Sequence, residues 1–332
     1  MRTLFACLLF AFAADGVPAE STLAAQNRAL LEHVQQVHGY SAEQMAALRL
    51  LFEISGYMGQ GNPAISVHAD TREACVARAE AHEPGYADPD FERICGARYM
   101  APLYDPAREQ PADARACIDQ FEFPDIPCEY PVVWVKAREA ALACRAIGKR
   151  LCDAHEWEGA CQGALEPPDY RFDLAEGVSW GAAVARMRAA HNLAHAADAR
   201  WSYGAEFQRG VCAQNGRKSA SCQGGGWSQC GSNTYPAGDF PACRSPLGVY
   251  DLNGNAAEHM NLPLAPSQMA SRGSETLGVT EMKGSWFIFD RYRAHPDWCR
   301  WRAPFWHGGA VMDAHSHANY HLGFRCCKNV AR

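Results

Sequence analysis

The chain has 332 residues, of which 48% are hydrophobic and 20% charged, as in globular proteins with one large domain and an extension or with two modest domains. With a formal net charge of -6, the chain is not strongly basic. Because nucleic acids and anionic membranes attract clustered lysine and arginine, neither is expected as a partner.

The N-terminus has the layout of a secretory signal peptide. Arg2 precedes an apolar run over residues 4–14, and small residues follow as far as Ala19. The run is too short to span a membrane. We therefore expect residues 1–19 to be a signal peptide and the protein to be exported, either to a periplasm or out of the cell. A buried N-terminal helix is the alternative.

The chain contains 15 cysteines. Cys7 lies in the apolar run and would leave with the signal peptide, so 14 cysteines remain. An even number of cysteines in an exported chain favours disulfides. No two cysteines have the Cys-x-x-Cys spacing of a zinc ribbon.

Residues 20–116 are predicted to form a helical N-terminal extension. Apolar residues recur at helical spacing within residues 21–54, which predicts two helices, and the glycine-rich tract 56–63 is expected to end them as a loop. Cys75 and Cys95 are the only cysteines in residues 70–116. The simplest expectation is that these two pair and staple a small helical unit.

Residues 117–332 are predicted to form the main domain, because apolar and aromatic runs begin at residue 117 and continue to the C-terminus. Residues 132–135 are predicted to form a short strand, and residues 136–147 are predicted to form a helix with one apolar face. Asp153, with Glu156 three residues later, predicts the start of a second helix. Residues 181–235 show little periodicity and are expected to be rich in loops.

Four segments occur in order along this domain. They are Pro131-Val-Val-Trp-Val with the tract Cys144-Arg-Ala-Ile-Gly-Lys-Arg-Leu-Cys-Asp-Ala-His-Glu-Trp-Glu, then Gly248-Val-Tyr-Asp-Leu-Asn-Gly-Asn-Ala-Ala-Glu, Lys283-Gly-Ser-Trp, and Leu322-Gly-Phe-Arg-Cys. Together they resemble the family of sulfatase-modifying, formylglycine-generating enzymes and their relatives in ergothioneine and pyoverdine synthesis. This resemblance implies an α+β fold, a single irregular C-type-lectin-like domain with little regular secondary structure.

The segment from Asp251 to Glu258 supplies two carboxylates and small residues whose carbonyl groups can turn inward, which suits a hard cation such as calcium. The resemblance implies a calcium site with Asp251 and Glu258 as side-chain ligands and Gly254 and Ala256 as carbonyl ligands. An Asx turn with two solvated acids is the alternative. The resemblance also implies a second calcium site that begins at Asn192, although the loop after this residue does not align.

Two disulfides are implied by the resemblance, Cys144–Cys326 and Cys161–Cys299. Cys152 and Cys327 each lie near a member of the first bridge in the sequence and could pair. The spacing leaves other pairings open, including Cys117 with Cys128 and a separate loop region closed by Cys212, Cys222, Cys230 and Cys243.

The interval between Ser285 and Cys299 departs from the family. In the oxidase, two cysteines in this interval bind copper(I) and activate oxygen, because soft thiolates suit that ion. Here Ile288 stands at the first cysteine position and Arg293 near the second. Without a thiolate pair, formylglycine formation by the family's mechanism is not expected.

Histidines gather near the C-terminus. His315 and His317 would project to the same face of a strand, and with His321 they are candidate ligands for iron or copper; His307 belongs to the same cluster. Histidines in such loops also commonly bond to backbone or water.

Two functions therefore stay open. One is a metal-dependent oxidoreductase that acts on a peptide or small molecule. The other is a non-catalytic, calcium-stabilised binding or structural module.

Overall fold

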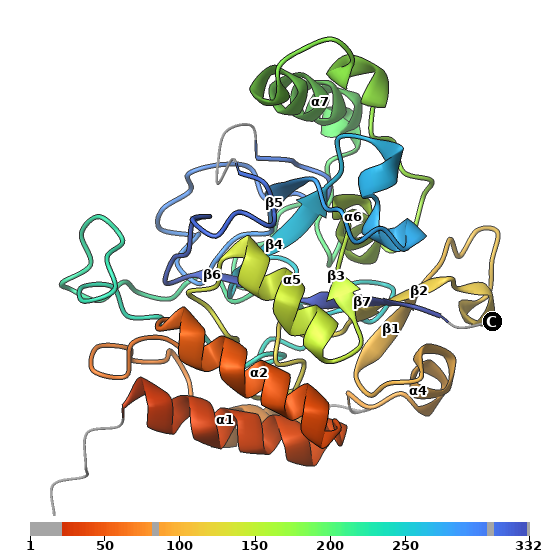
Figure 1. The fold of residues 1–332 in the computed structure, drawn as a ribbon. Coiled ribbons are helices and arrows are strands. Elements are labelled where there is room, and N and C mark those ends of the chain that lie inside the picture. The colour runs from red at the N-terminus through yellow and green to blue at the C-terminus, as the bar shows by residue number, and fades with distance from the viewer. Residues whose placement is uncertain (1–21, 82–85, 304–308, 331–332) are drawn as a thin grey trace, which may run out of the picture.

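The computed structural model describes residues 22–81, 86–303 and 309–330, and within them it shows a mixed α+β fold with two small sheets (Figure 1). The expected signal peptide, residues 1–19, and His307 lie outside these ranges. Over the described ranges, no helix has the length and apolar character needed to cross a membrane.

The N-terminal region forms two helices, α1 (Leu23–His38) and α2 (Ala42–Ser55), where the helical spacing predicts them. The Ser41 side chain caps α2 in a capping box with Gln44. Gly39 and Gly56 end the two helices with left-handed backbone, which glycine adopts without steric cost. Helix α2 lies between α1 and α5 in Figure 1, and the buried residues of all three helices share a core.

Helix α5 (Ala137–Ala146) and helix α6 (Ala154–Gln162) form as predicted. Asp153 and Glu156 make the expected capping box at the start of α6. The strand expected at residues 132–135 is wrong. Val133 makes only an isolated bridge with Gly59, and Trp134 has a φ of 58°, which interrupts the extended backbone that a strand requires.

The first sheet is antiparallel, with the strand order β1-β2-β7-β3. Its strands are β1 (Met100–Leu103), β2 (Ala116–Asp119), β3 (Arg150–Leu151) and β7 (Cys326–Asn329). The domain boundary expected at residue 117 therefore falls inside β2, and β1, which precedes that boundary, belongs to the sheet of the main domain.

In the second sheet, β4 (Ala257–Leu262) is central, with β5 (Val279–Lys283) antiparallel and β6 (Leu322–Phe324) parallel to it. Helix α7 (Trp180–His195) occupies part of the stretch expected to be rich in loops, so that expectation is wrong for these residues. Short 3-10 turns connect the elements at Pro111–Asp113, Phe172–Ala175, Ala196–Asp198, Pro266–Gln268 and Ala270–Arg272.

The expected Cys75–Cys95 bridge is wrong, and so is the Cys117–Cys128 pairing. Cys75, on α3 (Arg72–Glu80), is bonded to Cys128, and Cys95, on α4 (Pro89–Cys95), is bonded to Cys117 of β2. Each short helix packs against the main domain and not against the other helix's cysteine. The extension is therefore fastened to the main domain at two points.

The remaining bridges tie distant segments together. The structure pairs Cys144 with Cys326 and Cys161 with Cys299, as the family resemblance implies, and Cys152 with Cys327. Two more bridges, Cys212–Cys243 and Cys222–Cys230, close the loop region before β4. All 14 cysteines in the described residues are thus in disulfides.

Candidate functional site

Three buried carboxylates, those of Glu122, Asp251 and Glu258, gather around the buried guanidinium of Arg325. Arg325 donates to both Glu258 oxygens at 2.7 Å, and Trp157 Nε1 donates to Glu258 Oε2 at 3.0 Å. Glu122 accepts from Asn255 Nδ2 and from the Ala256 backbone N–H, each at 2.7 Å. Three acids therefore face one arginine in a water-poor interior.

Because the carboxylates outnumber the guanidinium, we compared them with the calcium site expected at Asp251 and Glu258. One oxygen of Asp251 accepts the Gly238 N–H at 2.6 Å, while its Oδ1 is buried with no hydrogen-bond partner. Burial raises the pKa of Asp251 to about 7, because the Gly238 N–H and the nearby Arg325 charge offset only part of the cost of desolvating the carboxylate. Asp251 therefore fits a cation ligand. Glu258 does not fit in the same way, because Arg325 already occupies both of its oxygens.

Asn192, expected to begin a second calcium site, lies on α7 and is bound to the backbone of Arg302. Its Nδ2 donates to the Arg302 carbonyl and its Oδ1 accepts the Arg302 N–H, both at 2.8 Å. This pair of bonds holds α7 against residues 300–303. The side chain thus has a structural partner on both of its polar atoms.

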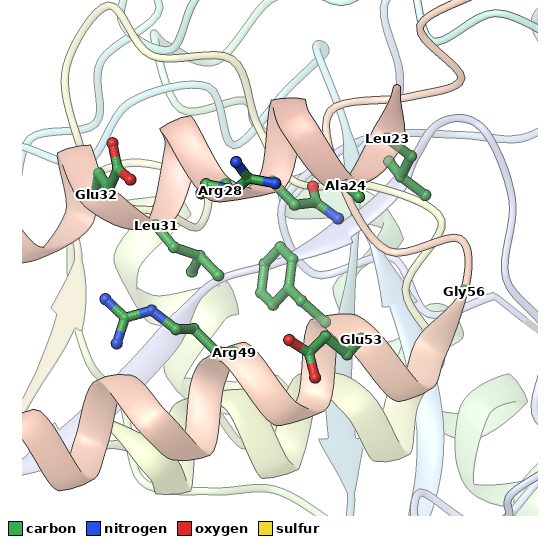
Figure 2. A pocket seen from close by; sticks show the side chains of 10 residues that line it. Leu23, Ala24, Arg28, Leu31, Glu32, Arg49, Glu53 and Gly56 are labelled. Atoms are coloured by element: carbon green, nitrogen blue, oxygen red, sulfur yellow. The ribbon is translucent and has the colours of Figure 1, made fainter. Parts of the chain in front are cut away.

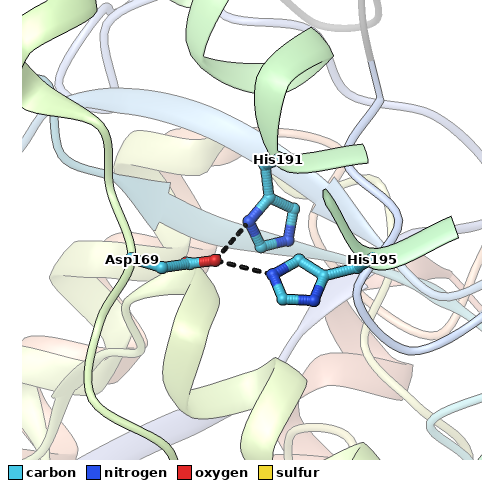
Figure 3. Close-up of side chains that lie close together, drawn as sticks. All are labelled: Asp169, His191 and His195. Carbon is cyan, nitrogen blue, oxygen red and sulfur yellow. Dashed lines mark hydrogen bonds and ion pairs between the residues drawn. The ribbon is translucent and has the colours of Figure 1, made fainter. Parts of the chain in front are cut away.

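A histidine and carboxylate cluster that sequence reasoning missed lies at the C-terminal end of α7 (Figure 3). Asp169 Oδ2 is 3.0 Å from His191 Nδ1 and 2.7 Å from His195 Nε2. The two histidines are four residues apart on one helix, so they project from the same face. Asp169 comes from the segment between α6 and α7.

Arginines border this cluster, and each is paired with a glutamate. Arg302 donates to both oxygens of the buried Glu158 at 2.9 and 3.0 Å, and Arg300 donates to Glu166 at 2.5 Å. Burial lowers the pKa of His191. Burial also works to raise the pKa of Asp169, but the neighbouring histidines and Arg302 more than offset it and leave that pKa well below its usual value.

The interval 285–299 forms part of the core. Ile288 is 1% exposed and shares an apolar cluster with Trp286, Phe287 and Phe289. Arg293 is exposed, and its guanidinium lies 3.9 Å from the centre of the Phe207 ring. Neither position carries a group that could ligate copper(I).

A sulfatase-modifying factor enzyme 1-like domain matches residues 104–330, which is more than half of the chain. The chain belongs to the sulfatase-modifying factor enzyme 1-like family. No curated protein matches it. A solved structure titled "Crystal Structure of CarF" is similar at 14% sequence identity with a TM-score of 0.29, over 82% of this chain and 86% of that chain.

Within this sulfatase-modifying factor fold, Ile288 stands at the first position where the resemblance places a copper ligand, and Arg293 stands near the second. No other cysteine in the described residues can replace them, because all are in disulfides. The described part of this family member therefore offers no thiolate for copper(I).

Of the C-terminal histidines, the structure describes His315, His317 and His321, and the ligand atoms of these three do not converge. His315 and His317 are exposed, while His321 is buried and stacks on Trp286 with ring centres 4.6 Å apart. We looked for groups of three or more His, Cys, Asp or Glu side chains whose ligand atoms all lie within 4.8 Å of one another. In residues 22–81, 86–303 and 309–330, Asp169, His191 and His195 form such a group. The strand assumed for residues 315–317 is absent there, so the two rings do not project from one strand face.

The N-terminal extension, outside the matched family domain, carries a groove between α1 and α2 with a volume of about 720 Å³ (Figure 2). Leu31 and Phe52 form its apolar floor, and charged side chains of both signs border it: Arg28, Glu32, Arg49 and Glu53. Cavities with apolar walls and a few polar groups are typical sites for small ligands. That a peptide or small molecule binds this protein stays a prediction.

Proposed function

We propose that this protein is an exported binding or structural module that keeps the sulfatase-modifying factor frame but does not generate formylglycine. The observation that carries the proposal is the loss of every thiol from the copper positions, where Ile288 is packed in the core. Seven disulfides support export, because such bonds form and persist in oxidising compartments.

A count of free thiols tests this proposal. The exported protein, denatured without reducing agent, is expected to react with no equivalent of a thiol reagent, because Cys7 leaves with the signal peptide and the other cysteines are paired. Reduction before labelling provides the control and should expose 14 thiols. Two reactive thiols in the unreduced protein would contradict the proposal, since a copper(I) pair would then be available.

We further propose that calcium stabilises the module at Asp251, with the Gly254 and Ala256 carbonyls as the other expected ligands. The buried Oδ1 of Asp251 without a donor supports this ion. Glu258 is left out of this ligand set, because the guanidinium of Arg325 supplies the positive charge at its carboxylate. Elemental analysis after dialysis should find calcium in the wild type and none in Asp251→Asn, and calcium retained by that variant would count against the site.

A metal-dependent oxidoreductase acting on a peptide or small molecule is the second candidate. His315, His317 and His321 do not support it, because they do not converge. The cluster of Asp169, His191 and His195 is the observation in its favour.

A further inference from the structure

His191 is in an unusual position for a neutral imidazole, because both of its ring nitrogens lie next to oxygen acceptors. Nε2 is 2.8 Å from the Arg300 carbonyl oxygen, and Nδ1 is 3.0 Å from Asp169 Oδ2. The residue is 2% exposed, and the contact of Nδ1 with Asp169 lacks hydrogen-bond geometry despite this distance. A neutral ring carries one N–H, so one nitrogen must present its lone pair to an oxygen.

A cation between Nδ1 and the carboxylate would remove this repulsion. The Arg300 carbonyl already accepts the Nε2 proton, which leaves the Nδ1 lone pair facing Asp169. Histidines that bind metals commonly have this arrangement, in which the other nitrogen donates to a carbonyl or carboxylate that fixes the tautomer. A second proton on His191, donated from Nδ1 to Asp169, is the competing explanation, and the metal titration decides between the two.

The spacing of the three ligand atoms also suits a metal ion. Ligand atoms about 2.0–2.1 Å from a tetrahedral zinc ion lie roughly 3.3 Å apart. The observed separations of 3.0 and 2.7 Å from Asp169 Oδ2 are about 0.3 and 0.6 Å shorter than this, and all three ligand atoms lie within 4.8 Å of one another. Figure 3 shows both imidazole rings turned toward the Asp169 carboxylate, as a shared metal ion would require.

The surroundings hold the ligands in place and leave one side open. Asn192 fixes α7 to the Arg302 backbone between the two histidines. The side chains of Asp169 and His195 are 33% and 21% exposed, so an ion could enter from solvent and keep a position for water or a small ligand. Arg300 and Arg302 lie 3.6 and 3.5 Å from Asp169; Arg300 is paired with Glu166, and Arg302 shares Glu158 with Lys283.

We infer that Asp169, His191 and His195 bind one divalent transition-metal ion of the zinc class, through two imidazole nitrogens and one carboxylate oxygen. This site is separate from the proposed calcium ligand at Asp251. It also does not depend on the proposed absence of oxidase activity, because a metal can serve either a structural or a catalytic role in this geometry.

Metal titration of the whole exported protein tests the site. Protein stripped with chelator, then kept in excess calcium, is titrated with Zn²⁺ against a chromophoric chelator and with Co²⁺ by visible absorption. The wild type is expected to bind one ion per chain. Asp169→Asn and His195→Gln change partly exposed side chains, and each should weaken binding by more than the roughly 10–100-fold cost of losing an outer-shell partner.

His315→Gln is the matched control, because it removes an exposed histidine outside the cluster and should leave the affinity unchanged. Thermal melting shows whether each variant is folded, and a misfolded variant is replaced by the other ligand substitution. Wild-type protein that holds no ion against the chelator would overturn the inference. Binding that survives both ligand substitutions, or that is lost in His315→Gln, would overturn it as well.

Discussion

Removing both bridges that join residues 144–152 to β7 is expected to lower the free energy of unfolding by about 6 kcal/mol, whereas removing either one alone should lower it by about 2.5 kcal/mol. The bridges Cys144–Cys326 and Cys152–Cys327 have sequence separations of 182 and 175, and their ends are close together in the chain. While one bridge remains, loss of the other opens a circuit of only about ten residues.

When both are lost, the nearest remaining crosslink is Cys161–Cys299, so the unfolded chain gains a circuit of about forty residues. The effect of the double removal should therefore exceed twice that of a single removal. Denaturant unfolding of the two Cys→Ala pairs and of their combination measures this. If the loss of unfolding free energy for the double removal equals the sum of the two single losses, the two bridges do not restrict the same part of the unfolded chain.

Replacing Arg325 by methionine is expected to lower the free energy of unfolding by about 3–5 kcal/mol. The guanidinium is fully buried and donates to Glu258, to the Tyr250 carbonyl, and to the carbonyls of residues 119 and 120. Its removal leaves Glu258 as an unpaired charge in the interior and leaves three backbone acceptors without this donor.

Denaturant unfolding with a double-mutant cycle checks the origin of this loss. Glu258→Gln combined with Arg325→Met should cost less than the sum of the two single changes, because the partner charge is gone. Arg138→Met, which changes an exposed arginine on α5, is the matched control and should stay within about 0.5 kcal/mol of the wild type. A loss for Arg325→Met as small as this control would contradict a buried ion pair.

Local signals predicted the helices well. The helical spacing of apolar residues placed α1 and α2, and the Asp153 and Glu156 pair placed the start of α6, because caps and periodicity are properties of a few neighbouring residues. Helix α7 was missed, although Ala183, Val184, Met187 and His191 recur on one face, a pattern that could have revealed it.

Long-range features could not be derived in the same way. The Cys75–Cys95 pairing assumed that cysteines near in sequence are near in space, but packing of each short helix on the main domain decides the partner. The Asp169 cluster depends likewise on where residues 163–171 meet α7. Only the spacing of His191 and His195 was visible in the sequence, as a pair of histidines four residues apart.

The central claim is that the family frame is kept while its oxidase chemistry is lost. The most direct measurement is mass spectrometry of a sulfatase-derived cysteine peptide after incubation with the purified protein, copper(I) and oxygen. The peptide is expected to keep its cysteine, because Ile288 and Arg293 cannot hold copper(I). Conversion of that cysteine to an aldehyde that requires the protein would contradict the account.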